Sequence, residues 1–115
     1  MKITDEDVIE YLSLFTSIPS FLLGRWARSG TNLASRFSSR IVSEYGKLSD
    51  HDRRRVRAVL EMDVDEIQEV LRRAHERTGK KQLMILSDPS SREFIERNLA
   101  EIRSLIGDRT SSHST

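Results

Sequence analysis

Residues 30–60 read GTNLASRFSSRIVSEYGKLSDHDRRRVRAVL. Apolar side chains recur in this stretch every three or four residues: Leu33, Phe37, Ile41 and Tyr45 in its first part, and Val56, Val59 and Leu60 in its second. This spacing places each set on one face of an α-helix. Gly46 lies between the two sets, and glycine is a poor helix former. The stretch therefore predicts two amphipathic helices, over about 31–45 and 50–60, that are separated at Gly46.

The faces opposite these apolar stripes are basic. Residues 21–59 hold eight arginines and Lys47 against Glu44, Asp50 and Asp52, although the whole chain has nineteen basic and eighteen acidic side chains. Clustered bases neutralise the phosphates of nucleic acid, and the planar guanidinium suits phosphate oxygens. We therefore expect a nucleic-acid-binding protein that uses the eight arginines of this segment: Arg25, Arg28, Arg36, Arg40, Arg53, Arg54, Arg55 and Arg57.

A solvated surface is the other interpretation of the same arginines. In that case Arg53 and Arg57 pair with Glu61 and with other acids, and the segment has no ligand. The two interpretations differ in one geometric respect. Binding needs guanidinium groups that lie together on the outside, whereas a solvated surface leaves each one beside its own carboxylate.

Three pairs of residues share the spacing of a capping box, which marks the start of a helix: Thr4 with Asp7, Ser49 with Asp52, and Asp63 with Glu66. Stripes of helical period follow each pair and also cover about 89–106, and a further helix is expected over about 18–28, with Pro19 in its first turn. Glycines at positions 30, 46, 79 and 107 are placed to end helices. The expected fold class is all-α, a compact multihelical bundle of five to six helices.

The apolar run at 83–86 is too short to assign by its periodicity. A strand here needs a pairing partner, and no other segment supplies one, so we expect a short buried helix over about 80–86. Residues 1–107 then form a single helical domain. Residues 108–115 are polar, and we expect a disordered tail there.

A second candidate surface is apolar. No charged side chain occurs between Tyr11 and Gly24. The apolar residues of the expected helix 18–28 do not share one stripe, as expected for a helix that awaits a partner. The alternative function is therefore a protein–protein adaptor or oligomerisation module that docks a partner on this helix, through Phe21, Leu22, Leu23 and Trp26. With the run at 83–86, this surplus of apolar surface leads us to expect a homodimer.

Other kinds of chemistry find no support in the sequence. There is no cysteine for a disulfide, a thiolate nucleophile or a thiolate metal site. His51, His75 and His113 lack the spacing of a zinc helix, and the acids at 61–66 lack the calcium-loop pattern. No glycine-rich phosphate loop or nucleophile elbow is present. We expect no enzymatic activity, no cofactor, no metal and no small-molecule substrate.

The uncharged run from Tyr11 to Gly24 is shorter than the roughly 20 apolar residues that cross a bilayer. Acidic residues at positions 5–7 occupy a place where a secretion signal carries positive charge. We therefore expect a cytoplasmic protein without a membrane partner.

Asn98 is a polar residue on an otherwise apolar helical face, beside Phe94, Ile95 and Ile102. Burial of an amide is costly unless its hydrogen bonds are made. We expect Asn98 to bond a nearby loop carbonyl rather than a ligand. In a dimer the same residue would set the register of two helices.

Overall fold

The computed structural model describes the backbone of residues 2–114 and the side chains of residues 2–107. The described chain forms α-helices and one short 3-10 turn, without a strand. The elements are α1 (Asp5–Tyr11), α2 (Ser13–Thr16), α3 (Ser20–Ser29), α4 (Leu33–Arg36), α5 (Ser38–Lys47), α6 (Asp50–Leu60), α7 (Val64–Thr78), α8 (Lys81–Ser87), η1 (Pro89–Ser91) and α9 (Arg92–Ser114). The all-α expectation is confirmed, but the nine α-helices of this part of the chain exceed the expected five to six.

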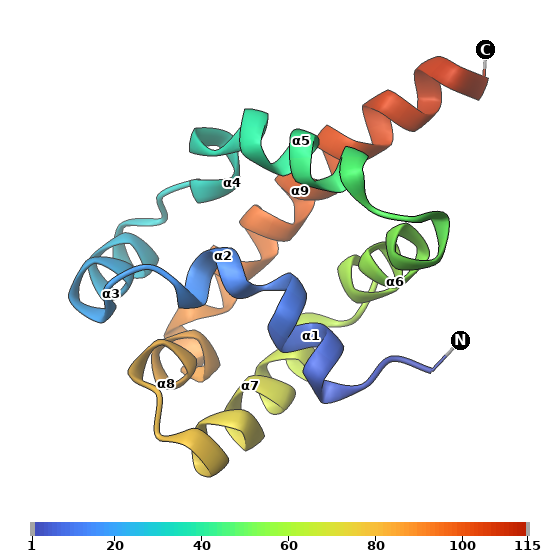
Figure 1. Cartoon of the computed structure of the whole chain (residues 1–115). Coiled ribbons are helices and arrows are strands. Elements are labelled where there is room, and N and C mark those ends of the chain that lie inside the picture. Colours follow the sequence, from blue (N-terminus) through green and yellow to red (C-terminus); the bar gives the residue numbers. More distant parts are fainter. Residues whose placement is uncertain (1, 115) are drawn as a thin grey trace.

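The long helix α9 runs through the middle of the molecule, and the other helices surround it (Figure 1). It contacts α4, α5, α6, α7 and α8. Phe94 and Leu99 on α9 are almost completely buried. The Phe94 ring meets the Phe15 ring of α2 edge to face, with centroids 5.8 Å apart, which is a favoured aromatic geometry. The core is therefore built along the apolar face of α9.

Two of the expected helices are each divided in two. The backbone leaves helical geometry at Leu12 (φ −103°, ψ 13°) and at Phe37 (φ −110°, ψ 27°). Neither position holds glycine or proline, the usual causes of a sharp kink. Leu12 is buried in the core and Phe37 packs against it. Tertiary packing therefore redirects the chain at both points, and with the short α8 these breaks account for the additional helices.

Side-chain caps lie at the predicted helix starts. At α1 the Asp7 N–H donates to Thr4 Oγ1 at 3.2 Å, and the Thr4 N–H donates to Asp7 Oδ2 at 3.0 Å. Ser49 accepts from the Asp52 N–H at the start of α6. Asp63 caps α7, although it accepts from the N–H two residues on instead of forming the expected box. The bounds of α6 and α7 match the predicted ones.

The apolar run after Lys80 is helical, as expected. The resulting helix, α8, packs against α3 and α7. Leu83 and Leu86 are buried, whereas 49% of Met84 is exposed. Gln82 donates from Nε2 to the Ile18 carbonyl at 3.0 Å, which attaches α8 to the segment before α3.

Glycine ends two helices and not four. Gly30 and Gly79 have φ of 72° and 69° and follow α3 and α7. Gly46 instead lies within α5, and Gly107 lies within α9, so the expected ends at these positions are wrong. A helical glycine costs only about 1 kcal/mol relative to alanine, which packing elsewhere offsets. The predicted disordered tail, 108–115, falls where side chains are not described, and its disorder stays a prediction.

Buried Asn98 joins α9 to the loop that precedes α4. Its Oδ1 accepts from the Ala34 N–H at 2.9 Å. Its Nδ2 donates to the carbonyls of Phe94 at 2.8 Å and Thr31 at 3.5 Å. The neighbouring Arg97 donates to the Gly30 carbonyl at 2.5 Å. The prediction that Asn98 bonds a loop carbonyl is confirmed, and these contacts hold α4 against α9.

Candidate nucleic-acid interface

The eight arginines selected from the sequence lie on four consecutive helices. Two are on α3, one each on α4 and α5, and four on α6. In Figure 1, α4 and α5 lie at the top of the view, between α3 at the left and α6 at the right. Six of the eight residues are exposed, and the half-buried ones are Arg53 and Arg55. The eight side chains thus come from four helices that follow one another in the chain.

Arg55 is engaged inside the protein. Its Nη2 donates to Asp7 Oδ2 at 2.6 Å, and the two side chains are 27% and 10% exposed. The Thr4 backbone N–H, followed by Arg55, lowers the pKa of Asp7, and the hydrogen bond to Asp7 raises the pKa of Arg55. Arg55 Nε is buried without a partner among the described atoms. Arg55 therefore ties α6 to the cap of α1.

Arg53 closes the end of α5. It donates from Nε to the Tyr45 carbonyl at 3.2 Å and from Nη2 to the Gly46 carbonyl at 2.6 Å. The last carbonyls of a helix have no partner within it, and a cation there also meets a favourable dipole. A longer contact of 3.8 Å joins Arg53 Nη1 to the Asp50 carboxylate. This side chain is held by the protein, and its first role is structural.

Two exposed arginines each lie over a half-buried aromatic ring. The guanidinium carbon of Arg36 lies 5.9 Å from the centroid of the Trp26 ring. That of Arg57 lies 6.0 Å from the centroid of the Tyr45 ring, and Arg57 Nε donates to the Tyr45 hydroxyl at 2.8 Å. Attraction between cation and ring favours these positions. Rings on α3 and α5 thereby hold arginines of α4 and α6 at the surface.

Five exposed arginines have no carboxylate partner within residues 2–107: Arg25, Arg28, Arg36, Arg40 and Arg54. Arg40 borders a groove of about 480 Å³ between the α1–α2 segment and α5. Glu10 and Glu44 also line this groove, and Tyr45 and Ile102 contribute to it from α5 and α9. The arginines of α3, α4 and α5 are thus directed to solvent with their charge uncompensated by a bonded acid.

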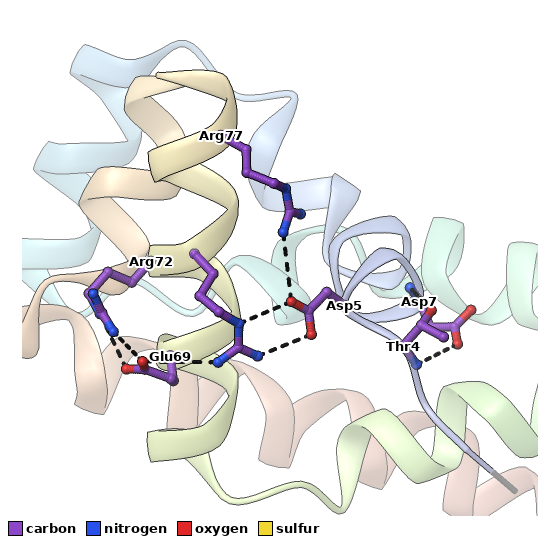
Figure 2. A network of polar contacts seen from close by, with 7 residues as sticks. Thr4, Asp5, Asp7, Glu69, Arg72 and Arg77 are labelled. Atoms are coloured by element: carbon purple, nitrogen blue, oxygen red, sulfur yellow. Dashed lines mark hydrogen bonds and ion pairs between the residues drawn. The ribbon is translucent and has the colours of Figure 1, made fainter.

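The arginines of α7 differ, because acids neutralise them locally. Figure 2 shows Arg72 beside Glu69, and Arg72 also lies 3.0 Å from Glu76. Arg73 donates to both carboxylate oxygens of Asp5 at 3.1 Å. The hydrogen bond from Arg73 is the main cause of the lowered pKa of Asp5, and that from Arg72 lowers the pKa of Glu69. The acids that neutralise the arginines of α7 thus have no counterpart at Arg25, Arg28, Arg36, Arg40 and Arg54 among the described residues.

The apolar residues of α3 are divided between surface and core. Phe21 is 79% exposed, and Leu22 and Trp26 are half-buried. Leu23 is 0% exposed and belongs to the core, so a partner on this face cannot touch it. Among the described side chains, Phe21 and Met84 of the adjoining α8 are the exposed large hydrophobics. The candidate docking surface therefore consists of Phe21 with parts of Leu22 and Trp26.

No known family model, curated protein or solved structure matches this chain. Over the described residues, no helix has both the length and the apolar character that crossing a membrane requires. The same residues contain no group of three or more histidine, aspartate or glutamate side chains arranged to hold a metal ion. The candidate site is therefore defined by the geometry of the arginines and the rings beneath them.

Tyr45 has a role that the sequence pattern did not indicate. Its spacing from Ile41 predicted a place in the apolar stripe, and Tyr45 does pack, half-buried, against the core, but its ring and hydroxyl also meet arginines of α6. A hydroxyl in the last turn of an apolar stripe is the signal that suggests such a boundary position, since buried tyrosines need a polar partner. Trp26 likewise belongs to the basic surface as well as to the apolar one.

Proposed function

We propose that this protein is a non-enzymatic nucleic-acid-binding protein that contacts phosphates through α3 to α6. The observation that supports the proposal is the exposure of five arginines without a carboxylate partner in the described part of the chain, on helices adjacent in the fold. Arg53 and Arg57 extend the same surface from α6. Arg55 is left out of the proposed interface because Asp7 occupies it.

Counterion release gives the proposed interaction its main physical test. Each phosphate that a basic side chain neutralises releases condensed cations, so the logarithm of the affinity falls with the logarithm of the salt concentration, with a slope of about 0.9 per contact on a duplex. A surface that uses five arginines in this way has a steep slope. A solvated surface with no ligand has no measurable affinity at moderate salt.

The experiment is a fluorescence anisotropy titration of labelled oligonucleotides at several salt concentrations. Reversal of charge in the double variant Arg36→Glu, Arg40→Glu is expected to weaken binding to all sequences alike and to reduce the salt slope by about two. The matched control is Lys80→Glu, Lys81→Glu, which changes the net charge equally at two exposed positions outside the proposed surface. An equal effect of both variants contradicts the proposal, because it indicates attraction to overall charge.

A second candidate function is protein docking through α3, and the 79% exposure of Phe21 favours it. Contiguous apolar surface often marks an interface, and aromatic residues often dominate the energetics of interfaces. Met84, on the α8 helix that packs against α3, is also exposed. We propose a second copy of the chain as the partner, which gives a homodimer.

Analytical ultracentrifugation at micromolar concentration tests the homodimer. The unsubstituted protein is expected to sediment as a dimer, and Phe21→Ser as a monomer with unchanged helical content. A monomer in both cases contradicts self-association. A complex with another protein through the same face is expected to be lost in Trp26→Ala and to persist when nucleic acid is added.

A further inference from the structure

The groove beside α5 exposes apolar side chains that the fold only partly covers. Its volume is about 480 Å³, which lies in the range of binding pockets. Buried Ile102 of α9 lines it, together with three half-buried side chains from α2, from α5 and from the position after α5: Leu14, Ile41 and Leu48. α5 packs on α4 and α9 and has no fully buried residue. The apolar core is therefore accessible from outside along this groove.

The charged residues of the groove are mostly acidic. Glu10 and Glu44 line it, and Arg40 is the one basic residue among the described residues that do so. Glu10 bonds no base in the described part of the chain. Glu44 has one long contact, 3.8 Å to Lys47, and exposed pairs of this kind contribute little. Two carboxylates are thus available beside an apolar groove, which suits an apolar side chain flanked by bases.

The exposed side of α3 has the complementary composition. Phe21, Arg25 and Arg28 lie at i, i+4 and i+7, so they share one side of the helix. Phe21 is 79% exposed, and the two arginines are exposed without a carboxylate partner among the described residues. Helices that dock in grooves present their anchors at this spacing. This side of α3 therefore offers an aromatic ring and two cations, and α3 contains no acid.

The groove and α3 belong to adjacent segments of the chain. α2, which lines the groove through Leu14 and Phe15, leads through Pro19 directly into α3 (Figure 1). Within one molecule α3 packs on α8, so its exposed side does not fill the groove. In a two-fold dimer the same two patches meet twice, and the assembly closes. A second copy of the chain thus supplies both complementary surfaces.

We infer that the proposed homodimer forms by reciprocal docking, with α3 of each copy in the groove of the other. Phe21 enters the apolar part of the groove. Arg25 and Arg28 meet the carboxylates on its walls, which belong to Glu10 and Glu44 of the other copy. The inference rests on the proposed homodimer and adds the surface that receives α3. In such a dimer the two arginines are paired and no longer available to phosphates.

Two double variants of opposite charge test the contact by sedimentation velocity at micromolar concentration. Arg25→Glu, Arg28→Glu reverses the bases of α3, and Glu10→Lys, Glu44→Lys reverses the acids of the groove. Each variant alone is expected to raise the dimer dissociation constant at least about tenfold, because like charges then meet. An equimolar mixture of the two variants is expected to dimerise again, because both contacts of the mixed dimer combine opposite charges.

The matched control is Glu61→Lys, Glu66→Lys. It changes the net charge as much as the groove variant does, at two exposed acids outside α3 and the groove. Charges away from the contact are screened by salt, so the dissociation constant is expected to stay within about twofold. A control that weakens the dimer as much as the groove variant overturns the inference, because the effect is then one of overall charge.

Two failures are distinguishable. If the unsubstituted protein is a monomer at micromolar concentration, the proposed homodimer is wrong and the inference fails with it. If the protein is a dimer that Phe21→Ser dissociates, but the groove variant remains a dimer or the mixture remains monomeric, α3 docks on another surface. In that second case the inference is overturned and the homodimer stands.

Discussion

Several arginines of this chain act on helix ends. Arg53 donates to carbonyls at the end of α5, Arg103 donates to the Leu60 carbonyl at the end of α6 at 2.6 Å, and Arg97 donates to the Gly30 carbonyl after α3. Carbonyls at the end of a helix have no partner within it, and the long side chain of arginine reaches them from another element. At the residue scale, part of the arginine content therefore serves to hold helix ends in place.

Asn98 provides the residue-scale prediction. Asn98→Leu keeps a similar volume but leaves the Ala34 N–H without its partner in a buried position. The expected loss is about 1–3 kcal/mol of unfolding free energy, measured by urea denaturation. Asn32→Ala, which removes the cap of α4 at a more exposed position, is expected to cost about 1 kcal/mol. An Asn98→Leu protein as stable as the original contradicts a structural role for this amide.

At the scale of elements, α5 differs from the other helices of the proposed surface, α3, α4 and α6, because it contributes no fully buried residue to the core. None of its residues is buried, and it packs on α4 and α9. Its end is closed by Arg53 and by the contact of Tyr45 with Arg57. The placement of Arg40 and Tyr45 therefore depends on contacts from α6 and on the apolar face of α9, since α5 has little core of its own.

Two glycines are expected to respond oppositely to replacement by alanine. Gly46 is helical, and no described atom lies within 4 Å of a Cβ built there, so Gly46→Ala is expected to stabilise the protein by about 0.5–1 kcal/mol. Gly79 has equal space but a φ of 69°, so Gly79→Ala is expected to destabilise it by about 1 kcal/mol. Urea denaturation of both variants checks this. A change of the same sign in both would show that their backbone conformations do not differ.

At the scale of the whole molecule, the acidic N-terminal helix is attached to basic side chains of two other helices. Asp7 bonds Arg55 of α6, and Asp5 bonds Arg73 and lies 3.8 Å from Arg77 of α7 (Figure 2). These contacts use acids of the first turn of α1, which also suit the positive end of that helix. Folding thus pairs the acids of the N-terminal helix with arginines of α6 and α7. The arginines of α3 to α5 have no bonded acid among the described residues.

Stability is expected to depend on pH through these acids. The pKa values of Asp5, Asp7 and Glu69 are lowered in the folded protein. Their contribution is therefore fully present above the ordinary carboxyl pKa of about 4 and is lost as the pH falls below it toward the folded values, because the unfolded chain then binds more protons. Urea midpoints at pH 7, 5, 4 and 3 measure the loss.

The double variant Asp5→Asn, Asp7→Asn is the control for this pH dependence. It is expected to be less stable at pH 7 and to show a shallower decline on acidification, since two of the responsible groups no longer titrate. A decline as steep as that of the unsubstituted protein would assign the pH dependence to other carboxylates.

Local chemistry explains which predictions from sequence are confirmed. Capping side chains and a stripe of period 3.6 act within a few residues, so the starts of α6 and α7 follow from the chain itself. The helical state of α8 was instead inferred from the lack of a segment that could pair with a strand. The breaks at Leu12 and Phe37 carry no local signal, and the expected helix count was too low for that reason. Nucleic-acid binding, the homodimer, the absence of catalysis and the cytoplasmic location stay predictions.

The sequence by itself determined an all-helical chain, its main caps and the concentration of arginine in residues 21–59, because propensity, capping and composition are local properties. Only the tertiary structure decided which arginines are bound within the protein. Asp7 lies 48 residues from Arg55 in sequence, and folding alone brings the pair to 2.6 Å. The same packing buried Leu23, exposed Phe21 and set Trp26 beneath Arg36, since which face of a helix meets the core depends on all its neighbours at once.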